Sequence, residues 1–148
     1  MSCIDRKTIL SMIPHQGAMC LWDAVIAWDD AGLTLRSASH RDAANPLRSD
    51  DQLRALHLCE YGAQAMAVHG GLRGRASGAP VRPGMLVALR GVQLHVARID
   101  DLAGDLTCVA EVLVESDDSQ QYAFRITCDG VPLAEGRAAV MLGPAQPL

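Results

Sequence analysis

The stretch that decides the fold is DDQLRALHLCEYGAQAMAVHGG, residues 50–71. Apolar side chains recur through it at helical spacing and also spread around the other side, as in a helix that protein surrounds. Asp50 and Asp51 suit its beginning, because acidic side chains favour the positive end of the helix dipole, and Gly70 and Gly71 suit its end. We therefore predict a central helix over about residues 51–70.

His57, Glu60 and Gln64 form one narrow polar stripe on this predicted helix, at spacing i, i+3 and i+7. A carboxyl held in apolar surroundings keeps its proton more readily near neutral pH, so Glu60 suits the role of a general acid. The alternative is a structural glutamate that pairs with an arginine at a subunit boundary. The helix alone leaves both interpretations open.

Composition narrows the function classes. The chain has 148 residues, a net charge of −4 and 49% hydrophobic residues, which fits one domain over residues 1–148. Two Trp, two Tyr and one Phe, with scattered basic residues, argue against a nucleic-acid partner. No stretch approaches the ~20 apolar residues of a membrane span, and the N-terminus does not read as a signal peptide, so we expect a cytoplasmic protein without a membrane partner.

The five cysteines are widely spaced and form no CxxC pair, which argues against disulfides and a thiolate metal site. We expect them to be reduced packing residues. Cys59 is next to Glu60 but faces another side of the predicted helix, so we do not expect it to be a nucleophile.

The strands predicted on either side of the helix indicate how the sheet is built. Before the helix, residues 24–40 form a hairpin around a turn at residues 29–32. After it, strands follow near residues 86–98, 106–115, 120–128 and 131–142, and turns at residues 117–119 and 129–130 join the last three in an antiparallel meander. One long helix that is apolar nearly all round suggests that this antiparallel sheet curls about it. The expected fold is therefore α+β, in the hotdog arrangement.

The segment from about residue 71 to 84 is rich in Gly, Pro and Arg, which favours a mobile loop. It suits a lid or a docking surface, and the alternative is a solvated connector.

Three motifs resemble bacterial 3-hydroxyacyl-[acyl-carrier-protein] dehydratases over most of the chain. The segment from Ile13-Pro14-His15 through residues 19–25 resembles their opening "PH…LLVDRV", and Asn45-Pro46 resembles their "NEP". The pentapeptide EYGAQ at residues 60–64 resembles "EALAQ" on their central helix. The strongest resemblance is to the dehydratase-like proteins of aryl-polyene pigment clusters, through SHRDAANPLR, EYGAQAMAVHG and LAEGRAAVML.

The resemblance implies that Glu60 is the catalytic carboxylate and Gln64 the neighbouring amide that positions the substrate. The family's catalytic histidine belongs to an HFPG segment, which is missing here, because Pro46 to Asp51 run straight toward the helix. His40 is our first candidate for the replacement base. His57 is the second candidate, with a role beside the substrate as its other possibility, whereas His15 resembles a family feature without a catalytic role. We expect His69 and His95 to be structural.

The implied reaction is a hydro-lyase step in fatty-acid-like or polyene biosynthesis. His40 takes the proton next to the thioester carbonyl, Glu60 protonates the departing hydroxyl, and backbone N–H groups near Leu53 and Arg54 hold the carbonyl oxygen. The product is the 2-enoyl thioester. We expect no metal and no redox cofactor, with the substrate carried on phosphopantetheine by an acyl carrier protein or as acyl-CoA. Docking charge is expected from Arg73, Arg75, Arg82 or Arg90.

Two alternatives stay open. A hotdog acyl thioesterase uses the same fold and a helix carboxylate to activate water or attack the thioester. A non-catalytic or half-site subunit is the other, because resembling dehydratases place their active sites at a dimer interface and some pair with a distinct second subunit. We expect a homodimer or higher oligomer, or a heterodimer of this second kind, because the open edge of a curled sheet is a template for pairing.

Overall fold

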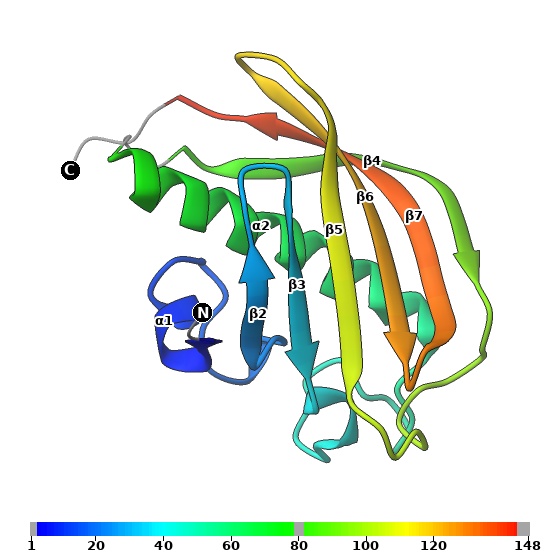
Figure 1. The fold of residues 1–148 in the computed structure, drawn as a ribbon. Coiled ribbons are helices and arrows are strands. Elements are labelled where there is room, and N and C mark those ends of the chain that lie inside the picture. The colour runs from blue at the N-terminus through cyan, green and yellow to red at the C-terminus, as the bar shows by residue number, and fades with distance from the viewer. Residues whose placement is uncertain (1–2, 79–81, 145–148) are drawn as a thin grey trace.

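The computed structural model of the chain describes residues 3–78 and 82–144, so the two ends and residues 79–81 of the predicted loop lie outside the described residues. Figure 1 shows the order of the elements along the chain. These are β1 (Ile4–Asp5), α1 (Arg6–Leu10), η1 (Gly17–Met19), β2 (Ala24–Trp28), β3 (Gly32–Ser37), η2 (Ser39–Arg41), η3 (Ala55–His57), α2 (Leu58–Ser77), β4 (Gly84–Leu94), β5 (Leu106–Glu115), β6 (Ser119–Cys128) and β7 (Val131–Leu142).

All described strands join one antiparallel sheet in the order β1-β2-β3-β5-β6-β7-β4, so β4 lies at one edge. The predicted hairpin and meander are confirmed, with β5 and β7 at the predicted bounds. Asp129 and Gly130 both have positive φ, 50° and 78°, in the turn between β6 and β7. That conformation matches the twist of a tight hairpin, as the Asp-Gly pair indicates.

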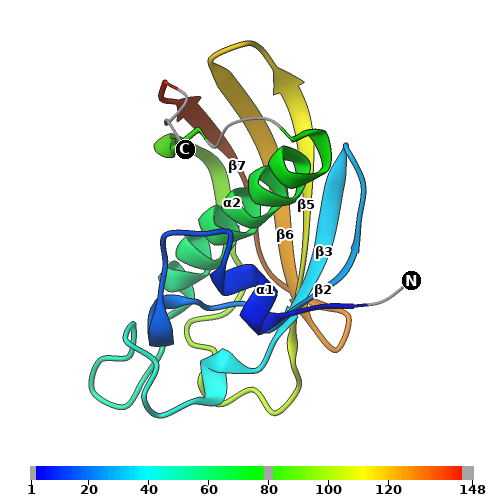
Figure 2. The ribbon, with the colours of Figure 1, turned by 90° about the vertical axis from the view of Figure 1, so that its left-hand side faces the viewer.

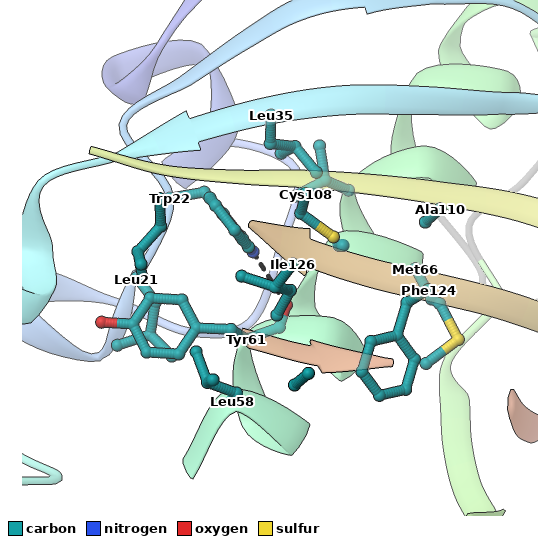
Figure 3. Packing of buried hydrophobic residues seen from close by; sticks show 14 of the residues in the cluster. Leu21, Trp22, Leu35, Leu58, Tyr61, Met66, Cys108, Ala110, Phe124 and Ile126 are labelled. Carbon is teal, nitrogen blue, oxygen red and sulfur yellow. Dashed lines mark hydrogen bonds between the residues drawn. The ribbon is translucent and has the colours of Figure 1, made fainter. Parts of the chain in front are cut away.

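Helix α2 lies along the concave face of the sheet, which curves around it (Figures 1 and 2). The helix approaches closely at Gly62, where an added Cβ would lie 2.9 Å from the Phe124 ring. Trp22 and Tyr61 pack edge to face with ring centroids 5.4 Å apart, and the Trp22 indole donates to the Tyr61 carbonyl at 2.8 Å (Figure 3). This is the expected hotdog arrangement, with the core between helix and sheet.

The helix begins later than predicted. Asp50 and Asp51 have positive φ, 53° and 59°, in a turn before the helix, and they do not cap it. The next residues are extended because they pair with a distant segment: Ile99 N–H donates to Leu53 O at 2.9 Å, and Ala55 N–H donates to Ala97 O at 3.0 Å. This tertiary pairing overrides the local helical pattern over residues 51–54.

The helix also ends later than predicted. It runs through Gly70 and Gly71 to Ser77, and Gly78 ends it in the left-handed conformation with φ of 67°. Residues 71–77 of the predicted loop are therefore helical. Leu72 is buried, and Gly71 packs against Met12, so contacts with the rest of the domain stabilise this last part.

A polar cluster joins the second half of α2 to the sheet. His69 is buried, with Nδ1 2.7 Å from the Tyr122 hydroxyl and Nε2 2.8 Å from the Asp29 carbonyl. Because a carbonyl only accepts, Nε2 carries the hydrogen and Nδ1 accepts from Tyr122. One turn later, Arg73 makes a double hydrogen bond with Glu115 at 2.7 and 2.9 Å. His69 therefore has the structural role that the sequence predicts.

Candidate functional site

Glu60 lies in the first turn of α2, with its carboxylate between an imidazole and an amide. Its Oε1 is 3.5 Å from His15 Nε2 and accepts from Gln64 Nε2 at 3.4 Å. The Glu60 side chain is 36% exposed, so the predicted apolar surroundings are wrong: the loop that carries His15 supplies a polar neighbour, and solvent reaches the rest. A half-exposed carboxyl with fixed neighbours is accessible to a substrate hydroxyl.

Gln64 is completely buried one turn after Glu60, and its amide holds the chain around residues 19–21. Its oxygen accepts from Leu21 N–H at 3.0 Å, and its nitrogen donates to Met19 O at 2.7 Å. The predicted position of Gln64 beside Glu60 is confirmed. Its role toward a substrate stays a prediction, because the contacts seen here are all with the protein itself.

His15 is the histidine that the structure brings to Glu60, although the family resemblance implied no catalytic role for it. It follows α1 in an irregular segment and is 29% exposed, with Nδ1 buried and without a hydrogen-bond partner among the described residues. The sequence signal for this contact is the Pro14-His15 pair lying a few residues before the segment that Gln64 holds.

His40 lies in η2, a few residues after the end of β3, as the sequence predicts. It is completely buried, and its Nε2 is 3.0 Å from the Leu102 carbonyl, so Nε2 donates and Nδ1 is left as an acceptor without a partner among the described residues. Burial lowers the pKa of His40, which keeps the ring neutral. No hydrogen bond or ion pair among the described residues joins His40 to Glu60, and the role of His40 as the base stays a prediction.

His57 is half-buried and immediately precedes α2, where its side chain makes no capping hydrogen bond. The first residue of the predicted polar stripe therefore lies just before the N-terminus of α2 instead of within the helix. A role for His57 beside the substrate stays a prediction.

The predicted donors for a carbonyl oxygen are not in place. Leu53 N–H donates to the Asp100 carboxylate at 2.8 Å, and Arg54 forms a β-bridge with Arg98. Both residues lie before the helix, because the helix begins later than the sequence predicts, and Leu53 N–H is already paired.

The Asn45-Pro46 motif contacts the EYGAQ motif of α2 at the Tyr61 hydroxyl. Asn45 Nδ2 donates to this hydroxyl at 3.1 Å, and Ser39 Oγ lies 2.7 Å from it. Ser39 and Asn45 also line a pocket of about 360 Å³ between η2 and the N-terminal segment. The remaining lining residues are Arg6, Ala18, Cys20, Asp23, Ala38 and Asp42.

The cysteines are all free, as predicted. Cys59 is half-buried, and burial raises the pKa of its thiol, which disfavours the reactive thiolate. The structure thus supports a packing role for Cys59.

Three of the four arginines predicted to dock a partner are engaged within the chain. Arg73 contacts Glu115, Arg75 donates to the Ser11 hydroxyl at 2.7 Å, and Arg82 pairs with Asp118 at 3.1 Å. Arg90 makes no such contact among the described residues and lines a small pocket.

The residues that the structure describes contain no group of three or more His, Cys, Asp or Glu side chains that could hold a metal ion. Neither α1 nor α2 combines the length and apolar character needed to cross a membrane.

Comparisons with known proteins give a family and a fold. The model of the ApeP-like family, described as ApeP dehydratase, matches residues 7–147. No curated protein matches the chain. The chain is similar to a solved structure titled the dehydratase heterocomplex ApeI:P from Xenorhabdus doucetiae, with a TM-score of 0.82 and 23% identity over 92% of this chain and 91% of that chain.

Two further solved structures show the same fold at lower similarity. A putative thioesterase from Shewanella oneidensis has a TM-score of 0.63 and 14% identity, with 94% of each chain covered. A hypothetical thioesterase with coenzyme A from Streptococcus pneumoniae has a TM-score of 0.62 and 11% identity, over 83% of this chain and 90% of that chain. At these identities the likeness shows the fold alone.

Proposed function

The chain belongs to the ApeP-like dehydratase family, and on this premise we propose that it dehydrates a 3-hydroxyacyl thioester to the 2-enoyl thioester. The proposed substrate is carried on the phosphopantetheine of an acyl carrier protein. In this reaction a base removes a proton from C2, the bond from C3 to the hydroxyl oxygen breaks, and an acid protonates that oxygen as water leaves. The electrons of the C2–H bond form the new double bond.

The observation that carries this proposal is the Glu60 carboxyl. It lies on the central helix, it is 36% exposed, and Gln64 and His15 fix its position. A held carboxyl that reaches solvent can give its proton to a substrate hydroxyl, whereas Tyr61 and Gln64 beside it are buried and committed to the protein. In this proposal Glu60 is the general acid.

We further propose that a second hotdog subunit supplies the residue that acts as the base. His40, the first candidate from the sequence, is buried against the Leu102 carbonyl and makes no described contact with Glu60. The similar structure from Xenorhabdus doucetiae is a heterocomplex, which supports a partner that differs in sequence from this chain. The His40 assignment is kept as the competing hypothesis and enters the same experiment.

Edge strand β4 is the proposed surface for that subunit. Its residues include the most exposed large apolar side chain on the sheet edge, Met85 at 68%, and Val87 at 51%. The strand pairs with β7 on one side only, so its other side presents free backbone groups to a partner strand. Pairing there would extend the sheet and cover these apolar side chains. The remaining exposed apolar members of β4 are Leu86, Leu89 and Leu94.

Mass spectrometry of a 3-hydroxyacyl carrier protein tests the proposal. The 3-hydroxyacyl carrier protein is incubated first with this chain alone. It is then incubated with this chain together with a second hotdog subunit whose gene is encoded beside that of this chain. Loss of one water only in the mixture supports the heteromeric dehydratase. Loss of water with the chain alone contradicts the need for a different partner, and in that case loss of activity in His40→Ala, with folding retained, supports His40 as the base.

The product separates the dehydratase from the thioesterase alternative. An enoyl thioester remains attached to the carrier, whereas hydrolysis gives a free carrier thiol and a released acid. Release of acid without an enoyl product would contradict the proposed reaction. Glu111→Gln serves as the matched control for Glu60→Gln, because Glu111 is exposed on β5 and pairs across the sheet with Gly32, away from α2.

A further inference from the structure

Arg90 on β4 and Arg137 on β7 are directly opposite each other in the sheet register. Both are exposed, and Arg137 points away from α2 because its neighbour Ala138 is buried on the helix side. Like charges at directly opposed positions of an antiparallel pair destabilise it. The pair therefore needs a compensating anion or separated side chains.

Neither arginine has an anionic partner within the part of the chain that the structure describes. The nearest acidic residue along β7 is Glu135, and it faces Arg125 at 3.9 Å and His95 at 4.0 Å. By contrast, Arg73 and Arg82 each lie within 4 Å of a carboxylate. On a chain with a net charge of −4, two arginines opposite each other without carboxylates form a local positive patch.

The two arginines line a pocket of about 170 Å³ together with Gln121, Ala138 and Ala139. Gln121 pairs with Ala139 in the β6–β7 register and is exposed, so its amide adds a neutral donor. The small Ala139 leaves room between the longer side chains. The site thus combines two guanidinium groups and one amide around a space of the size of a small anion.

We propose that Arg90, Arg137 and Gln121 bind a phosphate group. A guanidinium donates two parallel hydrogen bonds to oxyanions, and a phosphate with up to two negative charges compensates both arginines at once. Helix α2, which carries Glu60, lies on the concave face of the sheet (Figure 2). Arg137 points to the opposite, convex face, because its neighbour Ala138 is buried on the helix side. A subunit paired along β4 would extend the sheet in its own plane and leave this face open.

Thermal unfolding of the full chain, in phosphate and in chloride at equal ionic strength, tests the site. Phosphate should raise Tm of the wild type by about 2–4 °C, in a saturable manner, because it binds only the folded chain. Arg137→Gln and Arg90→Gln should abolish this rise. In chloride, Arg137→Gln should be at least as stable as the wild type, because the like-charge contact is relieved.

Arg125→Gln is the matched control, since Arg125 lies on the same face but has Glu135 as a partner. It should keep the phosphate response, and an equal loss in this variant would indicate general screening and overturn the site. An absent rise in the wild type would also overturn it. Coenzyme A and pantetheine identify the source of the phosphate. If coenzyme A raises Tm at lower concentrations than inorganic phosphate does, and pantetheine has no effect, the site binds a cofactor phosphate. If coenzyme A and inorganic phosphate act at equal concentrations, the site binds free phosphate. These results are independent of dehydration activity, so failure of either proposal is seen separately.

Discussion

His15 Nε2 lies 3.5 Å from Glu60 Oε1, and this contact joins the N-terminal segment to the central helix at the proposed site. Gln64 makes the contact possible, because it holds Met19 and Leu21 while also donating to Glu60. The carboxylate is thus positioned by two side chains that approach it from different parts of the chain.

Replacing His15 with Ala is expected to lower the rate of dehydration by about 10–100-fold, because the Glu60 carboxyl loses the neighbour at 3.5 Å that orients it, and a misplacement of ~1 Å can cost about 10²-fold in rate. The free energy of unfolding should change by less than about 1 kcal/mol, since the pair is partly exposed. His15→Gln, which keeps a polar side chain at this position, should recover part of the rate. An unchanged rate in His15→Ala would show that His15 does not position Glu60. His95→Ala, at an exposed histidine 4.0 Å from Glu135, is the control.

Gln64→Ala is expected to destabilise the domain by about 2–4 kcal/mol, because Leu21 N–H and Met19 C=O lose a buried partner. Urea unfolding measures this free energy. Gln93→Ala on edge strand β4 is the control, since Gln93 is exposed, and its effect should stay within about 0.5 kcal/mol. Equal stability of the two variants would contradict the role assigned to the Gln64 amide.

Stability should fall as the pH is lowered below about 6.5, the ordinary pKa of histidine, because burial lowers the pKa of His69 and His40 in the folded chain. The unfolded chain then binds protons that the folded chain does not. This contribution is complete above 6.5 and is lost as the pH falls through the folded pKa, at up to about 1.4 kcal/mol per pH unit for each ring.

Unfolding in urea between about pH 7 and pH 5 measures this slope. His69→Gln should make it shallower, whereas His95→Gln, at an exposed position, should leave it unchanged. A wild-type stability that is constant over this range would contradict the neutral, buried state of His69.

Val87→Lys on β4 is expected to weaken association with the second subunit by at least tenfold, because a lysine on an edge strand opposes pairing with another strand. Val109→Lys is the matched control: Val109 is 41% exposed, but β5 is an interior strand. Analytical ultracentrifugation of the mixed subunits measures the effect. If both variants weaken association equally, or if neither variant weakens it, the interface does not lie at β4.

The sequence predicts the sheet more accurately than the ends of the helix. Strand β6 alternates regularly between buried and more exposed residues, and a clear turn at Asp129-Gly130 separates it from β7, so these signals are local. The start of α2 depends on pairing of Leu53 and Ala55 with residues 97–99, a contact across the chain that no local pattern contains. Its end at Gly78 depends on burial of Leu72, which keeps Gly70 and Gly71 helical.

In the candidate site, too, contacts that depend on local spacing are predicted from the sequence, whereas contacts that depend on the path of distant segments are not. Glu60 and Gln64 are one turn apart on a helix, so their proximity follows from spacing. The approach of His15 depends on how the irregular segment after α1 folds back. The burial of His40 depends on the loop that carries Leu102, so neither position can be read from the sequence near the histidine itself.

The rate of enoyl thioester formation by the assembled subunits, with wild-type chain and with Glu60→Gln, tests the central claim most directly. Gln keeps the size of Glu and cannot donate a carboxyl proton. We predict a loss of about 10²–10⁴-fold in rate with unchanged assembly and unfolding free energy. A Glu60→Gln complex that dehydrates its substrate at the wild-type rate would contradict the role of Glu60 as the general acid.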